Sequence, residues 1–255
     1  MDQNTAGTVD KRALGLIPSA LVVIGGGIVA IIVISIIGLV LRLLFGLSLV
    51  GIISPFYEEP LKAIGLIALA MFFPASFASK KIGALLGALA GAIFGAFEIF
   101  DFSVLYNTLI NAGLLTHGTA NALLAARIFT SFPMHVIASA LFGLGVACAA
   151  MAATHRPGLR NIFSGNALSL IALAVGFHWV YNIFNIIPAL LLRSDIIGII
   201  LGFVVMLAGL YMAYRVYHYV PSRLEQLHPI GAKDLFMQAM GWGKKGGAPV
   251  PEKRL

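Results

Sequence analysis

Charged residues and cysteines are scarce in this chain, and each scarcity excludes a class of protein. Only 11% of the 255 residues are charged and 60% are hydrophobic, whereas a typical soluble globular domain is about 25% charged. The composition therefore excludes an ordinary soluble domain and predicts a polytopic helical membrane protein. Cys148 is the single cysteine, so a disulfide within the chain and a cysteine-based metal site are both excluded.

Two motifs of hydrolytic enzymes are also missing from the sequence. The chain has no H-E-x-x-H zinc motif and no serine in a nucleophile elbow. The apolar segment after the polar N-terminal residues is too long for a cleaved signal peptide and lacks a clear cleavage site. We therefore interpret that segment as the first membrane span.

The long apolar segments predict an all-α transmembrane helix bundle of about six to seven spans, each of about 20 residues. We expect a short tail at 1–12, a single transmembrane catalytic domain at 13–217 and a basic C-terminal tail at 218–255. The net charge of +7 is concentrated in the tails and short loops, which predicts that both termini are cytoplasmic.

The expected spans are separated by polar or basic segments. They cover residues 13–40, 55–78, 82–101, 133–154, 166–192 and 196–217. Residues 43–53 are apolar but too short to cross alone, so they extend the first span, re-enter the membrane or pair into a hairpin. Residues 102–132 are mixed in polarity, and we expect a loop with short helices on the outer side.

An acidic pair, Glu58 and Glu59, interrupts the second span and is followed by Lys62. Three charged groups facing lipid would cost on the order of 8–10 kcal/mol, so we expect them to face a wet cavity that serves chemistry or transport. Residues three and four apart share a helix face. Lys62 can therefore hold one carboxylate ionised, while the neighbouring like charge disfavours ionisation of the other. Such a pair can supply a base and an acid.

Glu98 lies at the end of a helix whose glycines recur every four residues. Such a stripe predicts close contact with another helix, and it consists of Gly83, Gly87, Gly91 and Gly95. Phe94 precedes Glu98 by one turn on the same side. Arg127 is interpreted as a loop charge or as a group that orients Glu98.

Two later spans add imidazole groups. His135 opens the fourth span, with Ser139 one turn later. His178 and Asn182 lie four residues apart in the fifth span, and an imidazole with a carboxamide suits a developing oxyanion.

Each of these residues also has a purely structural interpretation. The acidic pair would then be solvated at the membrane interface, and Lys62 would only neutralise one carboxylate. Glu98 would be the polar end of its span, His135 an interfacial histidine, and His178 with Asn182 an interhelical hydrogen-bond pair.

Taken in order, these residues resemble the motifs of the PrsW family of intramembrane proteases, which is related to the type II CAAX prenyl endopeptidases and the CPBP proteins. The resemblance covers about residues 54–185, most of the membrane core. The motifs are Glu58-Glu59-x-x-Lys62, Phe94-x-x-x-Glu98, His135-x-x-x-Ser139 and His178-x-x-x-Asn182. The chain departs from the family pattern at Ile99, where asparagine is frequent, and at Asn182, where aspartate is frequent.

The resemblance implies a glutamate-dependent endopeptidase that cuts a peptide bond in or near the membrane. One residue of the acidic pair would activate water, and Glu98 would assist or position it. His135 and His178 would bind the water or the tetrahedral oxyanion, to which Asn182 would donate. The supporting residues would be Lys62, Phe94, Ser139 and Arg127.

The sequence identifies no cofactor with certainty, and the resemblance leaves a metal open. Members of the family have been described as metalloproteases, so zinc or another divalent metal is a candidate. Its ligands would be Glu58, Glu98, His135 and His178.

Two other functions fit buried carboxylates, a lysine and histidines. One is a proton- or cation-coupled transporter, for which the sequence lacks an inverted repeat of polar half-helices. The other is a non-catalytic scaffold like the presenilin-complex subunit APH-1, which the intact acidic pair disfavours. For the protease we expect a membrane-protein or lipid-anchored peptide substrate, contact with the lipid bilayer and no nucleic acid, in the cell membrane of a prokaryote.

Overall fold

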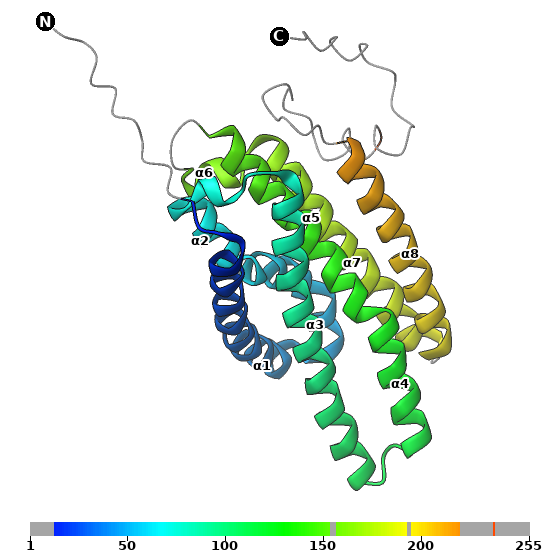
Figure 1. Cartoon of the computed structure of the whole chain (residues 1–255). Helices are drawn as coiled ribbons and strands as arrows, with labels where there is room; N and C mark the ends of the chain where they lie inside the picture. The colour runs from blue at the N-terminus through cyan, green and yellow to red at the C-terminus, as the bar shows by residue number, and fades with distance from the viewer. Residues whose placement is uncertain (1–12, 154–156, 193–194, 220–236, 238–255) are drawn as a thin grey trace, which may run out of the picture.

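The structure is a computed structural model that describes residues 13–153, 157–192, 195–219 and 237. All regular secondary structure among these residues is helical, as predicted (Figure 1). The N-terminal tail, and the C-terminal tail apart from residues 218, 219 and 237, lie outside the described residues.

Eight α-helices and one short 3-10 helix follow one another along the described chain. Their bounds are α1 Leu16–Lys62, α2 Ile64–Phe72, η1 Pro74–Ser76, α3 Lys80–Asn111, α4 His117–Phe129, α5 Ser131–Ala152, α6 Leu159–Ile162, α7 Gly165–Leu192 and α8 Asp195–Tyr219.

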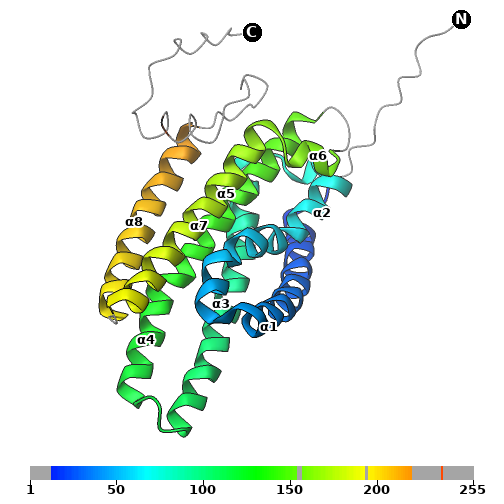
Figure 2. The ribbon, with the colours of Figure 1, turned by 180° about the vertical axis from the view of Figure 1, so that it is seen from behind.

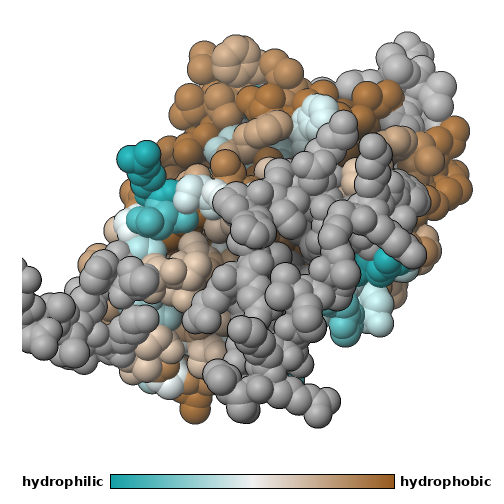
Figure 3. Space-filling model, turned by 90° about the horizontal axis from the view of Figure 1, so that it is seen from above, coloured by the Kyte–Doolittle hydropathy of each residue, from teal (hydrophilic) through white to brown (hydrophobic). Residues whose placement is uncertain are grey.

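Five of these helical segments are long and apolar enough to cross a membrane. They cover Leu16–Gly46, Lys80–Asn111, His117–Ala152, Ala167–Ile187 and Ile196–His218. Large apolar side chains are exposed along α1 and α8, where lipid would cover them. Brown apolar residues also cover much of the described surface in Figure 3. The chain is an integral membrane protein.

Helix α1 is a hairpin of two helical legs, one of the three alternatives that the sequence left open for residues 43–53. Gly46 has φ 77° and ψ 165° and is non-helical. The first leg runs antiparallel to the second leg and to α2, since Gly38 lies beside the Tyr57 hydroxyl and Gly26 packs against the backbone of Gly65 in α2. The second leg begins before residue 55, where the sequence predicted its start.

The hairpin returns the chain to the end of the bundle at which α1 begins. Figures 1 and 2 show the first leg of α1 running away from the end where α2 and α6 lie, and the second leg returning toward α2. The start of α1 and the end of α8 consequently lie at the same end of the bundle (Figure 1). The count of about six to seven spans and the cytoplasmic location of both termini stay predictions.

The glycine stripe of α3 packs directly on α5, the most buried helix. A Cβ at Gly87 would overlap the carbonyl oxygen of Ser139, and one at Gly91 would overlap that of His135. Only glycine permits this approach of two backbones. The stripe therefore fixes the α5 turns that carry His135 and Ser139 against α3.

Residues 102–132, predicted as a loop with short helices, are more regular than predicted: they comprise the end of α3, a short turn, α4 and the start of α5. Helix α3 continues to Asn111 because the sequence from 96 to 112 holds no glycine or proline to end it. Gly113, at φ 71°, makes the turn, and Thr116 caps α4 by accepting the Thr119 amide at 3.2 Å. The end of α3 and the start of α4 extend beyond the rest of the bundle (Figure 1).

We predict that Gly46→Ala destabilises the protein by about 1–3 kcal/mol, since a φ/ψ pair of this kind is open almost only to glycine. Unfolding of the purified protein in detergent measures the effect. Gly25→Ala is the matched control, because its added Cβ meets no atom within 4 Å. Equal stability of the two variants would show that the turn is unstrained.

We further predict that Gly91→Ala lowers stability by about 1–3 kcal/mol, because the new methyl group overpacks the α3–α5 contact. Gly176→Ala serves as the control, as its Cβ also has nothing within 4 Å. The same unfolding assay compares the two, and no loss in Gly91→Ala would contradict the close approach of α3 and α5.

Candidate active site

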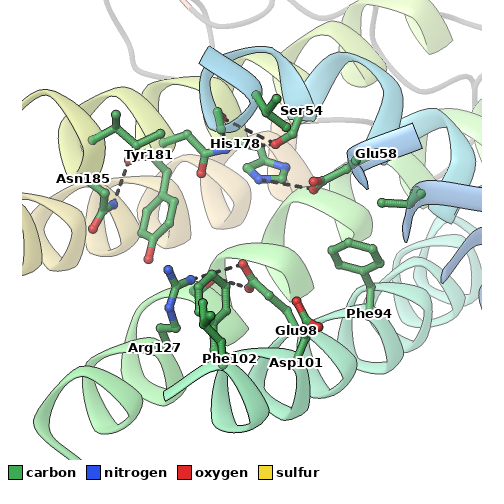
Figure 4. Close-up of a pocket in the computed structure, with 18 of the residues that line it drawn as sticks. Ser54, Glu58, Phe94, Glu98, Asp101, Phe102, Arg127, His178, Tyr181 and Asn185 are labelled. Atoms are coloured by element: carbon green, nitrogen blue, oxygen red, sulfur yellow. Dashed lines mark hydrogen bonds and ion pairs between the residues drawn. The ribbon is translucent and has the colours of Figure 1, made fainter. Parts of the chain in front are cut away.

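A cavity of about 730 Å³ lies between α1, α3, α4, α7 and the start of α8. Figure 4 shows Glu58 and His178 facing each other on one side of it, and Glu98 with Arg127 on the other. Its lining includes charged and polar side chains from five helices, α1, α3, α4, α5 and α7, and apolar and aromatic side chains make up much of the remaining wall.

Lys62 stands at the centre of the polar cluster beside this cavity and is almost wholly buried. Its Nζ lies 2.7 Å from Glu59 Oε1 and 3.5 Å from Glu58 Oε2. It also lies 2.8 Å from His135 Nδ1 and 4.0 Å from the centre of the Phe94 ring. A buried ammonium is tolerated only when it is paired and hydrogen-bonded, and these neighbours meet both conditions.

The two residues of the acidic pair occupy different environments. Glu59 has a side chain that is 0% exposed, and it accepts hydrogen bonds from Lys62, from His178 Nδ1 at 2.7 Å and from Ser139 Oγ at 3.2 Å. Glu58 has a side chain that is 14% exposed and lines the cavity. The rotation of the helix thus separates a buried, fully paired carboxylate from one that faces the cavity.

The contacts of His178 define its tautomer. Its Nδ1 faces the Glu59 carboxylate, which can only accept, so Nδ1 carries the proton. The other ring nitrogen, Nε2, lies 3.9 Å from Glu58 Oε2. A carboxylate and an imidazole nitrogen therefore lie side by side at the cavity wall.

His135 joins this group to Glu98. Its Nδ1 accepts from the Lys62 ammonium, so its Nε2 carries the proton and donates to Glu98 Oε2 at 2.9 Å. Arg127 Nη1 donates to Glu98 Oε1 at 3.2 Å. Arg127 hence orients Glu98, one of its two predicted roles, and a continuous chain of polar contacts runs from Arg127 to His178.

Phe94 and Ser139 hold the cluster in shape. The Phe94 ring packs edge-on against His135, with ring centres 5.0 Å apart, and its face covers the Lys62 ammonium. Ser139 donates to the oxygen of Glu59 that Lys62 leaves free. Each predicted supporting residue thus touches a member of the cluster.

Asn182 is bound to the backbone of α1. Its Nδ2 donates to the Gly51 carbonyl at 2.8 Å and lies 3.4 Å from Ser54 Oγ. The amide that would serve an oxyanion is engaged in this contact. In the described arrangement Asn182 fastens the second leg of α1 to α7 and thereby keeps Glu58 beside His178.

Ser131 was missed by the sequence analysis, although it donates to Glu98 Oε2 at 2.5 Å. Its position four residues before His135 places both on one face of α5, and this spacing was the available signal. Thr130 was missed as well, and its hydroxyl pairs with that of Tyr181 at 2.7 Å. No sequence spacing reveals that contact, because it joins α7 to the α4–α5 junction.

The fit of a divalent metal depends on His135. Glu58, His135 and His178 have ligand atoms within 4.8 Å of one another, a donor set known from zinc enzymes. Glu98, the fourth predicted ligand, is outside this group and contacts His135 Nε2. His135 Nδ1 faces Lys62, and a metal about 2.0–2.1 Å from that nitrogen would stand against the ammonium. With Lys62 in place, these residues do not fit a metal ion.

Comparisons with known proteins agree with the resemblance of the motifs. A family model described as "PrsW family intramembrane metalloprotease" matches residues 17–211, which include the whole cluster. Searches of curated proteins and of solved structures each returned no significant match.

We predict that Glu59→Gln destabilises the protein by about 3–5 kcal/mol, the cost of leaving a buried charge without its partner. Glu58→Gln should lose much less, because that carboxylate is partly exposed and lies farther from Lys62. Unfolding of both variants in detergent gives the comparison. Similar losses of stability in the two variants would contradict the conclusion that Glu59 is buried and fully paired whereas Glu58 faces the cavity.

Proposed function

The chain belongs to the PrsW family of intramembrane proteases, and on this premise we propose that it is an endopeptidase in which Glu58 activates the attacking water. The observation that supports this proposal most is the position of Glu58. It is the carboxylate of the acidic pair that lines the cavity, and it faces Nε2 of His178.

A water molecule in the cavity can reach both of these groups. The gap of 3.9 Å between Glu58 Oε2 and His178 Nε2 is too long for a direct hydrogen bond but suits a water that contacts both. Glu58 would take one proton as the water oxygen bonds to the peptide carbonyl carbon. It would then give that proton to the leaving amine as the C–N bond breaks.

The remaining residues would position this pair. Glu59 fixes the His178 tautomer and the direction of its Nε2, as a second carboxylate often does for a functional histidine. Lys62 contacts both carboxylates of the acidic pair and offsets part of their negative charge. Glu98 holds His135, and His135 holds Lys62.

Oxyanion stabilisation would come from His178, with Asn182 as a second donor only after its release from Gly51. With a proton taken from solvent on Nε2, the imidazole would present a donor and a positive charge to the cavity, and it would return that proton to solvent after the products leave. Glu59 would stabilise that charge through Nδ1. This arrangement explains why a fully buried carboxylate lies behind the histidine.

The cavity wall supports an apolar peptide as the substrate. Apolar and aromatic side chains of α1 and α3 line it, including Ile34, Leu39, Phe97, Phe102 and Leu105. A cavity of this composition inside a membrane protein suits a segment of a membrane protein or of a lipid-anchored peptide. The proposed location is the cell membrane of a prokaryote.

We predict that Glu58→Gln reduces cleavage of a single-span substrate by roughly 10²–10⁴-fold, the usual contribution of a general base, without loss of fold. His178→Gln should also reduce cleavage, whereas His117→Gln is a matched control, since His117 is exposed at the start of α4. The assay uses purified protein in liposomes or detergent.

Cleavage by Glu58→Gln at the wild-type rate would overturn the proposal. Ion flux through liposomes that depends on Glu98, without cleavage of any peptide, would favour the transporter. Co-purification with a separate protease, together with full function of the Glu58/Glu59 double mutant, would favour the scaffold.

A further inference from the structure

The ammonium of Lys62 occupies the position that a divalent metal would need, and we infer that it is the resident cation of this site in place of a metal. Its removal should convert the cluster into a divalent-metal site. The inference concerns the same residues as the proposed function, which it deepens, but its test reads metal binding and does not require cleavage.

The ligands around Nζ are those that a metal ion would take. Two carboxylate oxygens, from Glu58 and Glu59, lie 3.5 and 2.7 Å from it. One imidazole lone pair, from His135 Nδ1, lies at 2.8 Å. Anionic oxygens and a neutral imidazole nitrogen are also the ligands that zinc accepts. The ammonium therefore contacts the same kinds of atom that a zinc ion would bind.

The ammonium cannot simply move aside for an ion. Lys62 is among the largest fully buried side chains of the described residues, and the face of Phe94 covers Nζ at 4.0 Å. A metal bound to His135 Nδ1 would therefore meet a fixed positive charge at close range, in surroundings of low dielectric constant where like charges repel strongly. Binding of the metal and retention of the ammonium exclude each other.

His135 has no other nitrogen to offer. Its Nε2 carries a proton and donates to Glu98 Oε2 at 2.9 Å, while Glu98 is itself held by Arg127 and Ser131. Rotation of the imidazole to expose Nε2 would break this set of contacts and leave the buried Lys62 without an acceptor. The tautomer that the neighbours impose therefore reserves Nδ1 for Lys62.

Loss of the ammonium would free a complete donor set. His135 Nδ1 would become available, while Glu59 would keep its hydrogen bonds from His178 and Ser139. Glu58, His135 and His178 already present ligand atoms within 4.8 Å. Two histidines and one carboxylate constitute the protein ligands of several zinc sites, with a further position open to water. Lys62 lies three and four residues after the two glutamates, and this spacing places its ammonium where the metal would bind.

The test compares the wild-type full chain with Lys62→Met, which keeps an unbranched side chain but has no charge. Lys81→Met is the matched control, because Lys81 is exposed at the start of α3. Each purified protein is treated with a chelator, incubated with Zn²⁺ or Co²⁺ and desalted. Mass spectrometry of the elements then gives metal per chain, and the Co²⁺ form is examined by visible absorption.

We expect Lys62→Met to retain about one ion per chain, with the absorption of a tetrahedral Co²⁺ site, and the wild type to retain no more than Lys81→Met. Addition of His135→Gln to Lys62→Met should abolish this retention. A chelator should leave the wild-type protein's cleavage of its substrate unchanged.

Two results would overturn the inference. One is a wild-type protein that retains about one ion per chain and loses it in His135→Gln. The other is a Lys62→Met protein that is monodisperse and unfolds cooperatively but binds no metal. If Lys62→Met does not fold, the metal content of the wild type still decides, and neither result depends on whether the protein cleaves peptides.

Discussion

The structure of the site depends on one buried ion pair, between Lys62 and Glu59. Both groups are shut off from solvent, so each must be satisfied by protein atoms, and the two histidines provide much of that satisfaction. His135 accepts from the lysine and His178 donates to the carboxylate. The tautomers of both rings, and therefore the directions in which they can exchange protons, follow from the placement of this pair.

The helices that carry these groups are brought together by a glycine turn, a glycine stripe and a main-chain carbonyl outside the cluster. The hairpin turn at Gly46 brings the acidic pair back beside α3 and α7, and the glycine stripe lets α5 lie against α3 with His135 at the contact. Asn182 adds a hydrogen bond from α7 to the Gly51 carbonyl. A reactive carboxylate and an imidazole from distant parts of the chain are thereby held at a fixed separation.

The sequence predicted the membrane fold and the main members of the cluster. Charged and imidazole groups inside apolar helices are costly to expose to lipid, so they gather in a shared polar interior. It could not predict which glutamate faces the cavity, since that depends on the rotation of the second leg of α1. Gly46 looks like any glycine of an apolar helix until its φ is known. The partner of Asn182 is a main-chain oxygen, and no side-chain pattern identifies such an atom.

Arg127 connects α4 to the buried polar cluster. It belongs to α4, a helix in which only Ala120 is buried, yet its guanidinium grips Glu98 on α3, and Glu98 in turn holds the imidazole of His135. The position of the His135 ring on α5 therefore depends on α4 through two successive polar contacts, although α4 itself contributes only one buried residue.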